Sequence, residues 1–463
     1  MEEETRQDYS SLSTSTGSSS TLPPLVAPKR FEQCLLFFCG LGSSVAYIAT
    51  LSSLVLFKAM FGPDSYVDLN LAVYLPLLPV SLLQAKFDTR FDVAYQSRRT
   101  FLFRGIIAFG LILWGTIGIL ISFSTQYHCT LNVLIGNAVL QGTGGAILYG
   151  TLNQLSSFLG PTDEECRKAK ATISAGVQAS ALLVLLISLG SGFGTHNSTR
   201  FPVFIGLIVA TELVCVLMFS ILWCSREGGV AASMFRRDSS LRLDTIETLN
   251  LVVSEAEDAN LEESVVESNS LDQENPLQEP LLSVVDARTE SHSELWKYSK
   301  SCCFILLLTL IPSFLVGSWF THVNSEWMRL PQILFYVRIA ADFLGRLTTI
   351  CVPPSSLSCL TGLCLLRLVP VLFFFARNRE SSNYIGSAAT FEAATFDIGL
   401  VSIIAFLSGY LVTGTFQLAP QCIPQDLRQS NNLTKQASIL TVAFSVAAIL
   451  GLISSFCLSA IGF

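Results

Sequence analysis

Two stretches decide the fold: FPVFIGLIVATELVCVLMFSILW at residues 201–223 and FILLLTLIPSFLVGSWF at residues 304–320. Each has almost no charge over a length close to the roughly 20 residues that a helix needs to cross a bilayer core. Inside that core every backbone amide must find its partner within the chain, and a continuous helix meets this condition. A β-barrel would show alternating segments of about ten residues instead. The sequence therefore predicts an all-α, polytopic bundle of membrane helices.

The composition agrees with this class. Of the 463 residues, 51% are hydrophobic and 14% are charged, whereas a soluble domain carries about 25% charged residues. The 13 cysteines are scattered without a CxxC pair and histidine is scarce, so no metal site is expected. The motifs HExxH, GxxxxGK[ST] and GxSxG are absent, which predicts that the chain is not an enzyme and has neither catalytic residues nor a cofactor.

Windows of about nineteen residues predict about eleven transmembrane spans. The predicted spans are 34–58, 68–85, 103–124, 131–153, 171–191, 201–224, 301–321, 331–352, 356–376, 396–418 and 434–460. Six spans within residues 34–224 and five within 299–463 form two bundles, which is a common transporter plan. The acidic segment 225–298 between them is predicted to be a disordered cytosolic tether or, alternatively, a regulatory segment. Residues 1–33, rich in Ser and Thr, are predicted to be a disordered cytosolic N-terminus.

Lys and Arg in the short loops predict the orientation. The loop after the second span carries Lys86, Arg90, Arg98 and Arg99, whereas the loops after the first and third spans carry neither residue type. This alternation places the N-terminus in the cytosol and the sequon at Asn197 on the outer side, where glycosylation can occur. The plasma membrane is the expected location, with an endomembrane such as the vacuole or lysosome as the alternative.

Polar groups inside the predicted spans are the candidate functional residues, because each must be compensated in hydrocarbon. Asp342 and Arg346 lie four residues apart on one helical face and can pair. The pair must face the bundle interior or a watery cavity, so it marks a substrate path or, alternatively, an ion pair that locks two helices. Arg338 lies two turns before Arg346 and either lines the same face or reaches water at the outer end of the span.

Further candidates lie in other spans. Arg367 is a cation in a proline-bearing span, where it contacts substrate or has a gating or packing role. Gln141 lies among small residues, where its amide binds a base or sugar edge or bonds to a neighbouring helix. Tyr47 and Tyr74 offer aromatic walls for a cavity.

Five segments resemble the equilibrative nucleoside transporter family. AADFLGRLTT (340–349) looks like that family's DWLGR segment, LRLVPVLFFFARN (366–378) like RLVFVPLLLLCN, NAVLQGTGGAILYG (137–150) like AxxQGSLFG, FLSGYLVTGTFQLAP (406–420) like FSNGYL…P, and GLGSSVAYIATLSSLVLF (40–57) like GLGTLLPWNFF. The matches follow the order of the family's segments and together cover nearly the whole membrane region.

The resemblance implies an architecture similar to the major facilitator superfamily and facilitative transport of nucleosides or nucleobases by alternating access. Carried over to the matching positions, it implies that Asp342 and Arg346 contact the ribose or complete a polar floor. It likewise implies that Gln141 binds the base and that Tyr47 and Tyr74 line the cavity.

The chain departs from the family at two hydrogen-bonding positions. The family's Trp-Asn pair is Tyr47-Ile48 here, and its SNGY is the LSGY of residues 407–410. Two helices therefore lack an asparagine. Gly409 and Tyr410 match this family pattern, and a gating or structural role is expected for them.

Several alternatives stay open. The chain could carry another solute, such as a sugar, drug or amino acid, on a similar fold, or it could be a membrane receptor or scaffold that does not transport. Proton coupling through Asp342 is a variant of the transport hypothesis. The expected partners are a small-molecule substrate and the lipid bilayer, and no nucleic acid is expected.

Overall fold

The structure of the chain is a computed structural model. It describes residues 29–62, 65–124, 130–157, 159, 163–193, 198–224, 229–235, 237–238, 292–320, 330–383, 391–428 and 430–460. Asn197 and most of the acidic segment lie outside these residues, so glycosylation and the tether stay predictions. The regular structure of the described residues is entirely helical, which confirms the all-α class.

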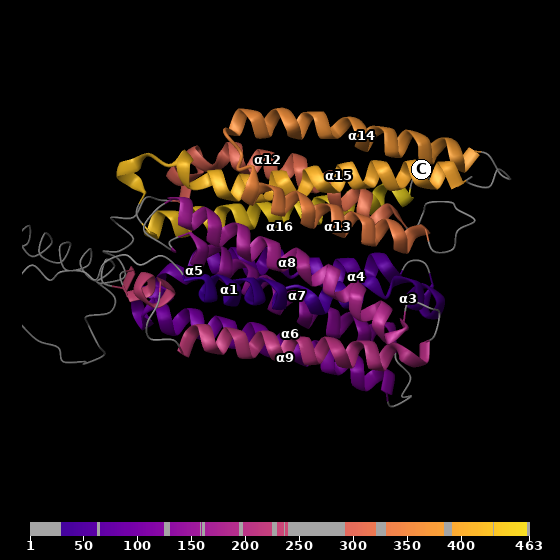
Figure 1. The fold of residues 1–463 in the computed structure, drawn as a ribbon, viewed down its shortest axis with the longest axis horizontal. Helices are drawn as coiled ribbons and strands as arrows, with labels where there is room; N and C mark the ends of the chain where they lie inside the picture. The colour runs from indigo at the N-terminus through magenta and orange to yellow at the C-terminus, as the bar shows by residue number, and fades with distance from the viewer. Residues whose placement is uncertain are drawn as a thin grey trace, which may run out of the picture.

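The helices form two groups that lie side by side (Figure 1). The N-half comprises α1 (Arg30–Gly42), α2 (Val45–Ser52), α3 (Leu54–Phe61), α4 (Ser65–Tyr74), α5 (Leu77–Tyr95), α6 (Ser97–Ser124), α7 (Leu131–Ser156), α8 (Asp163–Ser191) and α9 (Phe201–Cys224). The C-half comprises α12 (His292–Trp319), α13 (Leu330–Cys351), α14 (Leu357–Asn383), α15 (Phe391–Leu418) and α16 (Ser430–Ala460). The halves meet where α8 packs on α13 and where α5 and α7 pack on α16.

Within the described residues, nine helical stretches are long and apolar enough to cross a membrane, and the bent pair α1–α2 is a tenth candidate. The remaining predicted span, 331–352, is helix α13. It is not counted among the nine because three charged residues, Arg338, Asp342 and Arg346, lie within it and make it less apolar. Each of the eleven predicted spans thus corresponds to helix in the structure.

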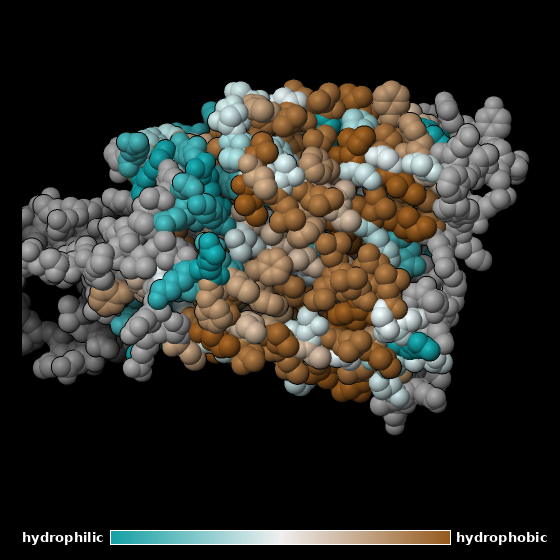
Figure 2. All heavy atoms as spheres, in the orientation of Figure 1, coloured by the Kyte–Doolittle hydropathy of each residue, from teal (hydrophilic) through white to brown (hydrophobic). Residues whose placement is uncertain are grey.

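The outer surface fits a bilayer. Trp114, Leu372 and Phe103 are 73%, 68% and 64% exposed, although each is a large apolar side chain. Figure 2 shows apolar residues over most of the face in view and hydrophilic residues gathered at one end, here called the polar end, where α5 ends and α6 begins. Such a surface is stable in lipid rather than in water. The chain is a multi-pass membrane protein.

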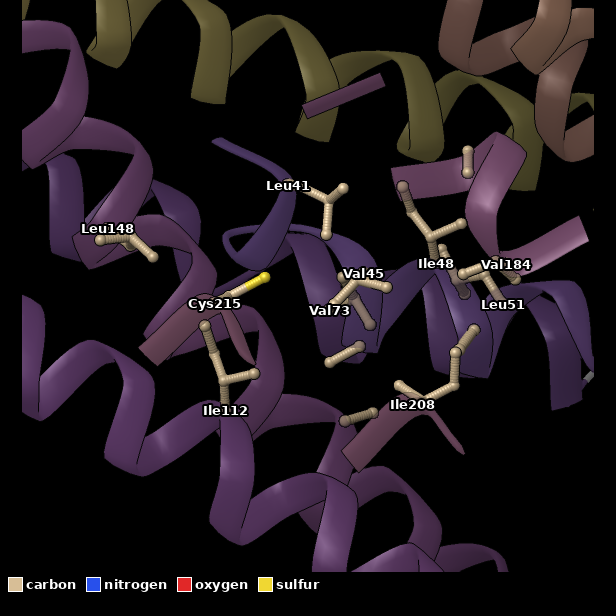
Figure 3. Close-up of a cluster of buried hydrophobic side chains, with 14 of the residues drawn as sticks. Leu41, Val45, Ile48, Leu51, Val73, Ile112, Leu148, Val184, Ile208 and Cys215 are labelled. Carbon is tan, nitrogen blue, oxygen red and sulfur yellow. The ribbon is translucent and has the colours of Figure 1, made fainter. Parts of the chain in front are cut away.

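The core of the N-half is built from aliphatic side chains. Figure 3 shows Leu41, Val45, Ile48, Leu51, Val73, Ile112, Leu148, Val184, Ile208 and Cys215 converging from α1, α2, α4, α6, α7, α8 and α9. Seven helices of the N-half therefore share one packed interior, and the same apolar cluster continues into the C-half at Phe335 and Val401.

Two helical stretches are interrupted near their middle, and a third contains a proline. α1 and α2 meet at an angle of 40° around Ser43, and α4 gives way to α5 at Leu75 and Pro76. α12 contains Pro312. A proline removes a backbone donor, and such breaks are tolerated in a membrane only where the backbone is covered by protein or lines a cavity. The two breaks and Pro312 therefore mark places where a cavity can form.

Several helix ends differ from the predicted spans. Residues 86–102, expected in a loop, belong to α5 and α6, which meet at Gln96 with a φ of 70°. α1 begins at Arg30, inside the segment expected to be disordered, and residues 229–235 are helical within the expected tether. Hydropathy windows detect only the apolar part of a helix, so they miss the charged turns that extend it.

Gly409 of α15 allows a close approach to α13, because a Cβ at this position would collide with the backbone carbonyl of Asp342. We expect Gly409→Ala to destabilise the protein by about 1–3 kcal/mol, since a packed backbone cannot yield as a side chain does. Gly399→Ala, in the same helix, is the matched control, because no atom lies within 4 Å of its Cβ. Thermal unfolding in detergent measures both, and equal melting temperatures would contradict this packing.

Candidate functional site

A cavity of about 150 Å³ lies between the two halves. Its wall includes Ser43, Tyr47, Tyr74, Tyr149 and Gln178 from the N-half and Phe314, Arg338, Asp342, Arg346, Ser408 and Phe444 from the C-half. Both helix breaks border it through Ser43 and Leu77, and Ser313 borders it next to Pro312 of α12. The cavity is therefore built where the helices are broken and where both halves contribute side chains.

Asp342 and Arg346 form the ion pair that their spacing predicts. Arg346 Nε lies 2.9 Å from Asp342 Oδ2, and Arg346 is 6% exposed. Its Nη1 donates to Ser174 Oγ of α8 at 2.7 Å. Since α13 belongs to the C-half and α8 to the N-half, this guanidinium links the two halves at the cavity wall.

Arg338 lines the same cavity, two helical turns before Arg346 on α13. Its guanidinium carbon lies 6.0 Å from the centre of the Phe314 ring. No ion pair joins it to an acidic group of the described residues. The described wall therefore carries more cationic hydrogen-bond donors than acidic acceptors.

Arg367 reaches the cavity wall but its donors are used inside the C-half. Nε donates to the carbonyl of Ile404 at 2.8 Å, while the two terminal nitrogens donate to the carbonyl of Thr309 and the hydroxyl of Ser313. The side chain is fully buried. It thereby ties α14 to α12 and α15, which favours the packing role among the predicted ones.

Aromatic rings cover one side of the cavity. Tyr47 and Tyr74 meet edge to face with centroids 6.0 Å apart, and Tyr74 meets Phe314 at 4.9 Å. Tyr74 thus contacts an aromatic ring from each half. Such rings offer an apolar face on which a flat ligand can stack.

Gln141 does not reach the cavity. Its Oε1 accepts from Thr50 at 2.9 Å and its Nε2 donates to Thr116 at 3.1 Å, and the residue is 1% exposed. The expectation that Gln141 binds a base is therefore corrected: both ends of its amide are used between α2, α6 and α7. The sequence gives its helix but not the direction in which the side chain points.

Gly409 and Tyr410 also lie away from the cavity wall. Gly409 packs against the backbone of α13, as described above. Tyr410 packs on an apolar cluster that includes Leu360 and Leu411. Both positions are explained by packing within the C-half.

A buried charge network at the polar end was not expected from the sequence. Asp92 of α5 is 1% exposed and accepts from Arg104 and from Arg237, each at 2.7 Å. Arg104 also pairs with Asp88 at 3.2 Å. Burial lowers the pKa of Arg237, and the neighbouring Asp92 carboxylate opposes that change. One carboxylate thus holds two cations from separate parts of the chain.

The same network reaches the C-half. Arg237 donates to Thr434 of α16 at 3.1 Å, and Gln154 of α7 donates to Ser438 at 3.1 Å. Nearby, Lys170 of α8 donates to the carbonyl of Phe416 at 3.2 Å. The polar end is therefore closed by hydrogen bonds between the halves. The sequence carries one signal for this network, because Asp88 and Asp92 are spaced by one helical turn. Hydropathy alone places Asp88 and Asp92 in a loop, where such a spacing does not indicate a shared face.

No protein-family model matches the chain, and no curated protein matches its sequence. Among solved structures, the chain is similar to the major facilitator superfamily proton:xylose symporter XylE bound to 6-bromo-6-deoxy-D-glucose. The TM-score is 0.57 with 10% sequence identity, and the match covers 92% of this chain and 87% of that chain. This likeness shows that the chain has the major facilitator fold, as predicted.

Two structures of the fucose:proton symporter FucP are also similar in shape. The E. coli protein matches with a TM-score of 0.49 and 11% identity over 94% of each chain. FucP in its outward conformation matches with a TM-score of 0.49 and 11% identity over 93% of this chain and 92% of that chain. The likeness to the nucleoside transporter family remains a resemblance of sequence segments.

Replacing Asp92 tests the charge network. We expect Asp92→Asn to destabilise the protein by about 3–5 kcal/mol, because one buried arginine then lacks its carboxylate. Glu164→Gln, in the exposed pair with Lys168, should leave the melting temperature unchanged. Thermal unfolding of both variants in detergent provides the comparison. A melting temperature for Asp92→Asn equal to that of the control would show that the network is not needed for stability.

Proposed function

We propose that the chain is a membrane transporter that moves nucleosides or nucleobases across a bilayer by alternating access. The observation that carries this proposal is the position of Arg346, which lies at the cavity, pairs with Asp342 in its own half and donates to Ser174 of the other half. A solute that replaces Ser174 as the acceptor would bind Arg346 of the C-half in a cavity to which the N-half contributes Tyr47 and Tyr74, so both halves would contact it. Carriers with two bundles bind their substrate in this manner, at a site around which the halves move.

The cavity chemistry supports a flat, acceptor-rich solute. Arg338 and Arg346 offer N–H donors, while Tyr47, Tyr74 and Phe314 offer ring faces. A nucleobase has acceptor atoms on its edge and an aromatic face, so both kinds of group can be used at once. The segment resemblance to nucleoside transporters supports the same substrate class.

The polar-end network holds the two halves together at one end of the cavity. Alternating access requires that one end be closed while the other is open. In this conformation, Gln154 of the N-half donates to Ser438 of α16, and Arg237, which follows α9 and pairs with Asp92 of the N-half, donates to Thr434 of α16. Under the proposal this end faces the cytosol, in agreement with the lysines and arginines counted between α4 and α6. Rocking of the halves would break these bonds and open the cavity on that side.

A sugar is the second candidate substrate. The cavity wall also carries the polar groups of Ser43, Gln178 and Ser408, which suit hydroxyl groups. XylE is a proton:xylose symporter by its description. Competition between solutes separates the two candidates.

The test is uptake of radiolabelled adenosine, uridine and xylose into liposomes that hold the purified chain. We expect saturable uptake of a nucleoside, reduced by at least about tenfold in Arg346→Ala, because a hydrogen bond from a charged donor is lost. Lys297→Ala is the control, since it removes a cation with 69% side-chain exposure far from the cavity wall. Its uptake should equal that of the wild type.

The outcomes discriminate among the candidates. Xylose uptake without nucleoside uptake would replace the nucleoside proposal with the sugar proposal. A well-folded wild type that takes up none of the three solutes would overturn both and favour a receptor or scaffold. Equal losses in Arg346→Ala and Lys297→Ala would remove Arg346 from the substrate path.

A further inference from the structure

Glu212 is a carboxyl group enclosed in the N-half, away from the cavity. It lies in the middle of α9 and is 0% exposed. Ile208, Cys215 and Ile112, from α9 and the adjacent α6, belong to the apolar cluster in this region (Figure 3). An ionised carboxylate is costly in such surroundings unless a cation or several donors compensate it.

The contacts of Thr116 indicate where a proton must lie. Thr116 Oγ1 is 2.8 Å from the carbonyl oxygen of Ile112 and 3.0 Å from Glu212 Oε1, and it accepts from Gln141 Nε2 at 3.1 Å. Both close oxygen–oxygen contacts require a proton, yet a threonine hydroxyl has one. If Thr116 donates to Ile112, the second proton must come from Glu212. A neutral acid at Glu212 satisfies all three contacts at once.

The surroundings of Glu212 supply no compensating charge. Its second oxygen, Oε2, is buried and has no hydrogen-bond partner among the described residues. Thr116 of α6 and Gln141 of α7 face the group with a hydroxyl and an amide, while the titratable groups nearby are the thiols of Cys215 on α9 and Cys39 on α1. No Lys, Arg or His of the described helices pairs with it. Neither a cation nor a set of donors is present for an ionised carboxylate.

We propose that Glu212 is a proton-binding site, in which a neutral carboxylic acid donates its O–H to Thr116. The hydrogen bonds continue from Thr116 through Gln141 to Thr50 of α2. The next residue of α2, Leu51, lines the cavity. The proton is thus a ligand held behind the cavity wall, at a site separate from the one proposed for the solute. This site does not depend on the proposed transport function.

Infrared spectroscopy of the full-length protein in a detergent without carbonyl groups tests the site directly. A neutral carboxylic acid has a carbonyl stretch that a carboxylate lacks. We expect the wild type at neutral pH to show one such band that disappears in Glu212→Gln. The exposed Glu164→Gln is the control and should leave the band in place. A Glu212→Gln spectrum identical to the wild type in this region would mean that Glu212 is ionised and would overturn the proposal.

The stability of the protein should depend on pH through this site. The folded state holds a proton at Glu212 that the water-exposed carboxyl of the unfolded chain has released at neutral pH, so folding takes up a proton. Stability should therefore fall as the pH rises, by up to about tenfold in the folding equilibrium constant per pH unit. Glu212→Gln keeps a donor toward Thr116 without a titratable proton, so its pH dependence should be flatter. Identical pH profiles for the two proteins would contradict a bound proton.

A second variant protects the test against misfolding of Glu212→Gln. Thr116→Val removes the acceptor and leaves Glu212 in place. We expect its carbonyl band to remain but to shift to higher frequency, because the O–H is no longer hydrogen-bonded to the threonine. An unshifted band would overturn the assigned contact, and loss of the band would overturn the neutral state of Glu212.

Discussion

A charge inside a bilayer must find its partner within the protein, because hydrocarbon supplies none. Two arginines of the described spans meet this constraint: Arg367 donates to two carbonyls and a hydroxyl, and Arg346 combines an ion pair with a hydrogen bond to the other half. At the polar end, the buried Asp92 likewise pairs with two arginines. In each case the satisfied group ties together elements that lie apart in the sequence. The packing of the helices is therefore inseparable from the pairing of their few charges.

The properties that depend on local sequence could be predicted. Apolar runs identify the helices because transfer into hydrocarbon is decided by the composition of each stretch. The pairing of Asp342 with Arg346 followed from their spacing on one helix, and the structure brings the two groups within 2.9 Å. The aromatic wall was likewise anticipated, since Tyr47 and Tyr74 line the cavity. All of these follow from residues that are neighbours in one helix or whose segments resemble a known family.

The properties that depend on partners from distant segments could not be predicted. Gln141 has its amide between Thr50 and Thr116, and nothing in its own helix indicates that it points there rather than to the cavity. Arg237 lies 145 residues from Asp92, beyond a span that was expected to end in a disordered tether. Helix periodicity tells which residues share a face, but the facing helix is set by the tertiary fold. The polar-end network was missed for this reason.

The distribution of these contacts determines which of them a movement of the halves would break. The partners of Arg367 all belong to the C-half, and those of Glu212 all belong to the N-half. Rigid-body motion of the halves leaves such contacts intact, so neither of these two groups loses its partners. At the polar end, Lys170 of the N-half donates to the C-half, and Arg237, from the segment after α9, joins Asp92 of the N-half to Thr434 of the C-half. Water can solvate these groups after separation, because this end carries the hydrophilic surface (Figure 2).

The contact between Arg346 and Ser174 is the exception. It lies at the cavity, so a bound polar solute could replace the lost acceptor. The chain thus arranges its charges so that the two halves can part where water or solute is at hand.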